Sequence, residues 1–156
     1  MVVAGEVAMY LDTASVIKLL VREADSAWFN QALTGHPFET SELAMSEVRS
    51  ALLAKERAGH ISPAERVAAE ERFMGMVDDE LIKLYPLNRQ VLDRANAMLL
   101  ACHPKIPLRT LDALHVATCD LHRNRTLATT DARMRAACRQ FAIALVPANP
   151  DDVNAG

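Results

Sequence analysis

Aromatic residues are scarce in this 156-residue chain, where Phe, Trp and Tyr together make up 4% of the sequence. A core with so few rings must be built from Ala, Leu, Val, Ile and Met. That composition suits helix-rich α or α/β proteins better than aromatic-rich β sandwiches. Hydrophobic residues make up 51% and charged residues 24%, so we do not expect disorder. The length predicts a single domain over residues 1–156.

Cysteine is also scarce, and Cys102, Cys119 and Cys138 include no CxxC pair. An odd number of widely spaced cysteines argues against a disulfide framework. The first nine residues lack a basic segment followed by an apolar run, and no apolar stretch is long enough to span a bilayer. We therefore expect a cytoplasmic protein with no membrane partner.

The chain lacks an excess of positive charge, because its formal net charge is −3. A protein that binds nucleic acid by bulk electrostatics alone would usually be basic. If this protein handles RNA, a local feature must offset the phosphate charge. A divalent cation bound at an acidic site would do so.

Short apolar runs that predict strands alternate along the chain with segments at helical spacing. The predicted strands are residues 7–11, 38–40, 81–87, 126–130 and 143–146. The predicted helices are residues 13–21, 25–33, 41–58, 63–79, 88–99, 111–122 and 132–141. This order predicts an α/β fold with a short parallel sheet of about five strands flanked by helices. The two helices between residues 41 and 79 predict a helical hairpin beside the sheet.

Four acidic residues stand out by their position in this predicted order. Asp12 and Asp131 each follow directly after a predicted strand. Because the carboxyl ends of parallel strands meet at one edge of a sheet, we expect these two carboxylates at the same edge. Asp112 lies near the start of a helix among apolar neighbours, and Glu47 lies within a helix. We refer to these residues as the four acids.

Each of the four acids, taken singly, has a simpler interpretation. Asp112 or Asp131 would merely cap its helix, and Glu47 would be a solvated surface residue. The joint pattern favours a shared site, in which carboxylates held close together repel and raise one another's pKa values. A bound Mg²⁺ or Mn²⁺ removes that conflict, and these hard cations prefer oxygen ligands.

Four short segments carry a resemblance to a known family. They are residues 10–13 (YLDT), Ser41 with Glu47, residues 111–117 (LDALHVA) and residues 129–131 (TTD). In this order and at these distances they resemble the PIN domain, and in particular the VapC-type toxins of type II toxin–antitoxin systems. The resemblance covers nearly the whole chain and implies a PIN-like three-layer fold.

The resemblance also assigns roles to residues. It implies that the four acids are catalytic and hold Mg²⁺ or Mn²⁺. It implies hydroxyl groups beside the first and the last of the four acids, where Thr13 and Thr130 stand. Relatives often have serine two positions after the first aspartate, where this chain has Ala14 followed by Ser15. We expect that departure to affect only a supporting hydrogen bond.

In function, the resemblance implies a metal-dependent endoribonuclease that hydrolyses phosphodiester bonds of a tRNA, rRNA or mRNA. It further implies a homodimer and a VapB-type antitoxin that inhibits the enzyme. Two alternatives stay open: a housekeeping PIN-domain nuclease that processes RNA, and a non-catalytic PIN-like module that binds RNA or protein. The compact length favours the toxin, and the presence of all four acids favours the enzyme.

Other chemistries fit the sequence less well. A phosphatase that uses Asp12 as nucleophile wants a second aspartate where this chain has Ala14. His115, Cys119 and His122 lie at helical spacing, but no second ligand cluster accompanies them. Helix packing therefore explains them better than a zinc site.

Two further groups of residues are open to more than one interpretation. Five arginines give the last third of the chain a basic bias that suits an RNA path, an antitoxin contact or plain surface charge. They are Arg123, Arg125, Arg133, Arg135 and Arg139. A set of five apolar residues in the predicted hairpin indicates either a groove for a partner helix or an ordinary core face. Its members are Leu43, Leu52, Met74, Met76 and Val77.

Overall fold

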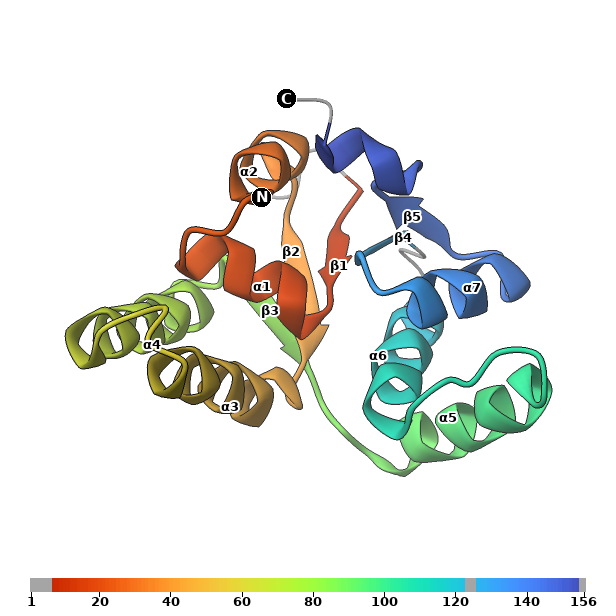
Figure 1. The fold of residues 1–156 in the computed structure, drawn as a ribbon. Helices are drawn as coiled ribbons and strands as arrows, with labels where there is room; N and C mark the ends of the chain where they lie inside the picture. The colour runs from red at the N-terminus through yellow and green to blue at the C-terminus, as the bar shows by residue number, and fades with distance from the viewer. Residues whose placement is uncertain (1–6, 123–125, 155–156) are drawn as a thin grey trace.

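The computed structural model describes residues 7–122 and 126–154 of the chain. Within them, five parallel strands form one sheet in the order β3-β2-β1-β4-β5 (Figure 1). The strands are β1 (Met9–Leu11), β2 (Phe38–Ser41), β3 (Ile82–Tyr85), β4 (Thr126–Ala128) and β5 (Ala144–Val146). β1 lies in the centre, with β2 on one side and β4 on the other. The predicted α/β fold with a five-stranded parallel sheet is confirmed.

Helices cover both faces of this sheet (Figure 1). One face carries α1 (Thr13–Leu20), α2 (Ser26–Leu33), α3 (Ala44–Arg57) and α4 (Pro63–Asp78). The other carries α5 (Arg89–Cys102), α6 (Thr110–Leu121) and α7 (Ala132–Gln140). A short 3₁₀ helix (Pro150–Asn154) follows β5. These three layers are the arrangement that the resemblance implied.

Local side-chain chemistry starts several of these helices. The Ser62 hydroxyl accepts the backbone N–H of Glu65, and the Glu65 carboxylate accepts the backbone N–H of Ser62. This pair is a capping box, and it starts α4. The Asn88 side chain accepts the backbone N–H of Val91 and starts α5 in the same way.

Among the element boundaries that differ from the predicted ones, two have a clear physical reason. The helix predicted from Ser41 begins at Ala44, because Ser41 is still paired with Tyr85 as the last residue of β2. The strand predicted over 81–87 ends at Tyr85. The next residue is Pro86, which has no N–H to donate to a neighbouring strand.

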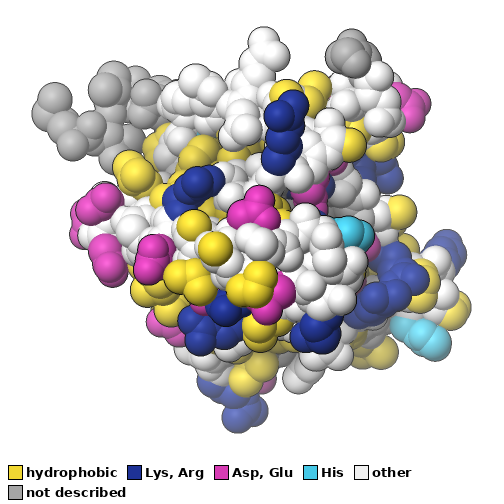
Figure 2. All heavy atoms as spheres, turned by 60° about the vertical axis from the view of Figure 1, so that its left-hand side comes forward, with side chains coloured by type: hydrophobic (Ala, Val, Ile, Leu, Met, Phe, Trp, Pro, Cys, Tyr) yellow, Lys and Arg dark blue, Asp and Glu magenta, His cyan; other side chains and the backbone are white. Residues whose placement is uncertain are grey.

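α3 and α4 form the predicted helical hairpin. The turn between them passes through Gly59, whose φ of +75° lies in the left-handed region that favours glycine. Leu52 and Phe73 are buried where the hairpin packs against α1, whereas Met74 is exposed. Figure 2 shows this side of the molecule, on which hydrophobic side chains gather among charged ones. The predicted apolar set is therefore divided between the core and the surface.

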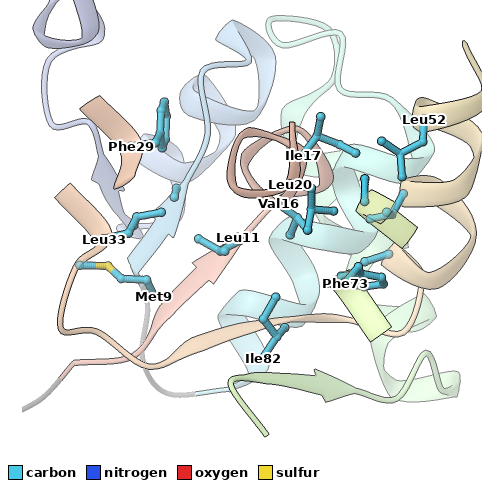
Figure 3. Close-up of a cluster of buried hydrophobic side chains, with 14 residues drawn as sticks. Met9, Leu11, Val16, Ile17, Leu20, Phe29, Leu33, Leu52, Phe73 and Ile82 are labelled. Atoms are coloured by element: carbon cyan, nitrogen blue, oxygen red, sulfur yellow. The ribbon is translucent and has the colours of Figure 1, made fainter. Parts of the chain in front are cut away.

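The sheet separates two apolar cores, because successive residues of a strand point to opposite faces. Leu11 of β1 packs with α1 to α4, and its neighbour Tyr10 packs with α5 to α7. Figure 3 shows the first core, in which Val16 and Leu20 from α1 meet side chains from the sheet and the hairpin. The site described below lies where the two layers meet at the carboxyl ends of β1 and β4.

In the part of the chain that the structure describes, no helix is both long and apolar enough to cross a membrane. Cys102, Cys119 and Cys138 all lie in that part and are buried thiols. The prediction that no disulfide framework supports the fold is therefore confirmed.

Candidate active site

Asp12 lies at the junction between the central strand β1 and helix α1, and only 4% of its surface is exposed. Its Oδ1 accepts the backbone N–H of Ser15 at 2.8 Å and so caps α1. The Ser15 hydroxyl donates to the carbonyl oxygen of Ala128, the last residue of β4, at 2.8 Å. Asp12 N–H donates to the same carbonyl at 3.3 Å. These bonds tie the ends of β1 and β4 together at one edge of the sheet.

Asp131 follows β4 and caps α7. Its Oδ1 accepts the backbone N–H groups of Arg133 at 3.0 Å and Met134 at 2.9 Å. Its own N–H donates to the hydroxyl of Thr129 at 3.1 Å. Both strand-end aspartates are thus helix caps, a role that the simpler interpretation gave to Asp131 but not to Asp12. Because each uses Oδ1 for capping, its Oδ2 is left for another contact.

Asp112 lies in the first turn of α6 and is half-buried, but the N-cap of that helix is Arg109. Burial raises the pKa of Asp112 above its ordinary value of 3.8, and the negative charges of Asp131 and Asp12 raise it further. Positive charge on Arg109 and His115 opposes the rise without cancelling it. The three aspartates are therefore close enough to repel one another.

Glu47 comes from the first turn of α3 on the opposite layer. Its Oε1 accepts two hydrogen bonds, one from the Thr13 hydroxyl at 2.8 Å and one from the Nε2 of His115 at 2.6 Å. Burial alone would raise the pKa of Glu47, but the bonds from His115 and Thr13 and the charge of His115 outweigh it and lower that pKa. Glu47 is therefore held as a carboxylate.

His115 was predicted to be a packing residue, and the structure shows that it lines the site. It lies three residues after Asp112 on α6, which puts both side chains on one face of the helix. Its ring is 2% exposed, and its Nδ1 lies 2.8 Å from the hydroxyl of Tyr10 in β1. Burial raises the pKa of that hydroxyl well above 10.0, so Tyr10 stays protonated. The i, i+3 spacing to Asp112 was the signal in the sequence.

One cavity of about 190 Å³ brings these side chains together. Its lining consists of Asp12, Thr13, Ala14, Glu47, Asp112, His115, Asp131 and Met134. All of the four acids are in this lining. Across residues 7–122 and 126–154, no three His, Cys, Asp or Glu side chains already form a metal-binding cluster. The donor set nevertheless fits a hard divalent cation, because the four acids offer carboxylate oxygens and neighbouring carboxylates repel.

The four acids share a second property, since each lies at the N-terminus of a different helix. Asp12 and Asp131 are the N-caps of α1 and α7. Glu47 and Asp112 lie in the first turns of α3 and α6. A helix N-terminus carries partial positive charge, which favours carboxylates and phosphate groups near it. Four helix ends therefore favour anions at this one place.

Of the three hydroxyl groups predicted to support the acids, Thr13 bonds Glu47 and Ser15 bonds a backbone carbonyl. Thr130 is exposed, and the hydroxyl that contacts the backbone of Asp131 belongs to the buried Thr129. The sequence alone could not separate these two adjacent threonines, because β4 ends at Ala128, two residues before the predicted end at Thr130.

The arginines behind the predicted basic bias have different environments in the structure. Arg135 is buried and donates to the carbonyl oxygens of Thr129 and Pro147 at 2.9 and 2.8 Å. It therefore holds the end of β4 to the chain after β5 and does not face a ligand. Arg133 is half-buried and Arg139 is exposed. Arg123 and Arg125 lie outside the described residues.

Residues 9–140 match the family model described as the PIN domain. The chain belongs to the PIN domain family. It is 36% identical over 145 residues to "Ribonuclease VapC46" of Mycobacterium tuberculosis, a match that covers 89% of this chain and 96% of that protein. The resemblance to VapC-type PIN domains is therefore confirmed.

Solved structures share the fold of this PIN domain. FitAcB from Neisseria gonorrhoeae superposes with a TM-score of 0.68 at 17% identity, covering 92% of this chain and 99% of that one. VapBC2 from Rickettsia felis, bound to a DNA fragment from their promoter, has a TM-score of 0.62 at 11% identity, and the match covers 88% of this chain and 96% of that one. A toxin–antitoxin complex from Klebsiella pneumoniae has a TM-score of 0.55 at 18% identity, and the match covers 83% of this chain and 90% of that one.

Proposed function

We propose that this PIN domain protein is a metal-dependent endoribonuclease, the toxin of a VapBC-type toxin–antitoxin module. The observation that carries the proposal is the convergence of the four acids on one cavity from four helix N-termini. The name of the relative from Mycobacterium tuberculosis, a ribonuclease, supports the same activity. The buried thiols suit a reducing cytoplasm, where we propose that the protein acts.

In this proposal Asp12, Asp112 and Asp131 hold Mg²⁺ or Mn²⁺, and Glu47 completes the set of ligands. When bound, such an ion lowers the pKa of a water molecule and stabilises charge on the scissile phosphate of RNA. The two capping aspartates offer Oδ2, since their Oδ1 atoms bind backbone N–H groups. The helix N-termini help to hold the phosphate near this acidic site, which would otherwise repel it.

A cleavage assay tests the enzyme. The purified protein is expected to cut RNA with Mn²⁺ or Mg²⁺, and EDTA is expected to stop the reaction. Asp12→Asn keeps an N-cap side chain at the start of α1 but removes the charge, so it should fold and lose cleavage. Ser46→Ala, an exposed neighbour of Glu47 on α3, is a control that should cut at the wild-type rate. Equal rates for Asp12→Asn and wild type would refute the proposed site.

We also propose an antitoxin partner and a homodimer. An apolar groove of about 570 Å³ lies along the hairpin, with Met45, Leu53 and Met74 exposed in its lining. It suits the apolar face of a helix from an antitoxin. Leu53→Glu should prevent co-purification with the product of a neighbouring antitoxin gene, while Leu100→Glu, on α5 at 78% exposure, should not. Failure of every such partner to bind would favour the housekeeping nuclease. The homodimer is tested separately, by light scattering of the purified protein.

A further inference from the structure

We propose that His115 is a positioning residue, which holds Glu47 in one orientation and thereby sets the affinity of the site for its divalent ion. The observation behind it is an unbroken chain of side-chain hydrogen bonds from the sheet to the cavity: Tyr10 to His115, and His115 to Glu47. The inference rests on the proposed function, because it takes the divalent ion of that proposal as the ligand.

The imidazole of His115 is bonded at both of its ring nitrogens. The carboxylate of Glu47 can only accept, so the Nε2 of His115 carries the proton of their 2.6 Å bond. The Nδ1 of His115 lies 2.8 Å from the Tyr10 hydroxyl, so the imidazole has a hydrogen-bond partner at each ring nitrogen. Partners at both ring nitrogens hold the imidazole in one orientation.

Burial makes this chain of bonds rigid. Tyr10 is 1% exposed and His115 is 2% exposed, while the side chain of Glu47 is 21% exposed. The two rings pack edge to face, with centroids 5.9 Å apart and an interplanar angle of 70°. Tyr10 lies in the central strand two residues before Asp12. One strand therefore places Asp12 directly and, through His115, places Glu47 from the opposite layer.

Glu47 needs such support more than the three aspartates do. A glutamate side chain has three rotatable bonds and loses that freedom when it binds a metal ion. Asp12 and Asp131 are already held by capping bonds to their own helices, whereas the bonds to Glu47 come from Thr13 and His115 on other helices. Both of these bonds end on Oε1, which leaves Oε2 for the ion.

The chain offers variants that separate this role from plain packing. His115→Leu keeps an apolar side chain in the core but removes both hydrogen bonds. His115→Gln carries an amide N–H at about the distance of Nε2, so it is the conservative variant. His122→Leu is the matched control, because His122 ends the same helix and stacks on Tyr85 with a centroid distance of 3.4 Å. Tyr10→Phe keeps the buried ring but removes the hydroxyl that contacts the Nδ1 of His115.

The measurement is Mn²⁺ binding by the purified full-length protein, followed by calorimetry and by the loss of the free-ion EPR signal. Residues that orient a metal ligand typically contribute about 10- to 100-fold in metal affinity. We expect a loss in that range for His115→Leu and a partial recovery with His115→Gln. Tyr10→Phe should give a smaller loss, and His122→Leu should bind as wild type does.

A double-mutant cycle decides whether His115 acts through Glu47. If it does, His115→Leu combined with Glu47→Gln should bind Mn²⁺ no more weakly than Glu47→Gln alone. Additive losses, or a His115→Leu protein that binds as wild type does, would overturn the inference. Should His115→Leu fail to fold, His115→Gln and Tyr10→Phe carry the same cycle. A wild-type protein that binds no Mn²⁺ would instead refute the proposed function, and the inference with it.

Discussion

Asp131 has two roles in this protein, a cap and a proposed metal ligand, and two substitutions should separate them. Asp131→Asn keeps a side-chain oxygen that can accept the N–H groups of Arg133 and Met134, but it removes the charge. Asp131→Ala removes both the cap and the charge. The first variant is expected to keep the stability of the fold, and the second is not. Both are expected to lose RNA cleavage.

The capping bonds set the size of the effect. Replacing a capping aspartate with alanine costs about 1 kcal/mol, and asparagine caps about as well as aspartate. For a chain of this length, 1 kcal/mol changes Tm by roughly 2–4 °C. In EDTA we therefore expect Asp131→Ala to melt about 3 °C below wild type. Asp131→Asn should melt near wild type, because losing the charge weakens the interaction with the α7 dipole but relieves repulsion of Asp112.

Mn²⁺ then distinguishes ligand from cap. An ion at 100 times its Kd stabilises the folded state by about 2.7 kcal/mol, so the Tm of wild type should rise by roughly 5–11 °C. Asp131→Asn should show little of this rise. Melting curves by circular dichroism with EDTA and with Mn²⁺, and a cleavage assay on the same samples, give the result. If Asp131→Asn kept both the Mn²⁺ shift and the cleavage rate, Asp131 would be a cap only.

Three further predictions concern charge and packing. The folded state raises the pKa of Asp112 above its ordinary value of 3.8. The contribution of this carboxyl group to stability is therefore full below pH 3.8 and is lost as the pH rises through the pKa of the folded state. In EDTA, the free energy of unfolding of Asp112→Asn, measured with urea, should therefore rise relative to that of wild type from about pH 4 to pH 7. A constant difference between the two proteins across this pH range would contradict the prediction. Arg135→Ala loses charged hydrogen bonds to buried carbonyls and should cost roughly 2–4 kcal/mol by the same method, whereas exposed Arg139→Ala should cost almost nothing. Leu52→Ala, at 0% exposure, should cost about 3 kcal/mol, and a loss under 1 kcal/mol would show that the hairpin is not part of the core.

The element order could be predicted because its signals are local. Capping groups such as Ser62 and Asn88 and short apolar runs such as the one ending at Leu11 depend on residues a few positions apart. The exact ends of the helices and strands were harder to predict from the sequence. Whether Ser41 ends a strand or starts a helix depends on its pairing with Tyr85, which is 44 positions further along the chain in a separate strand.

The sequence by itself determined the strand-end positions of Asp12 and Asp131, because a parallel sheet brings the ends of its strands to one edge. Only the tertiary structure decided what meets them there. Glu47 reaches the cavity from the other layer, and its partner His115 lies 68 positions away. The sequence showed this histidine only as one residue of a buried helix. The pKa shifts of Asp112 and Glu47 likewise come from charges and hydrogen bonds that the fold alone brings within range.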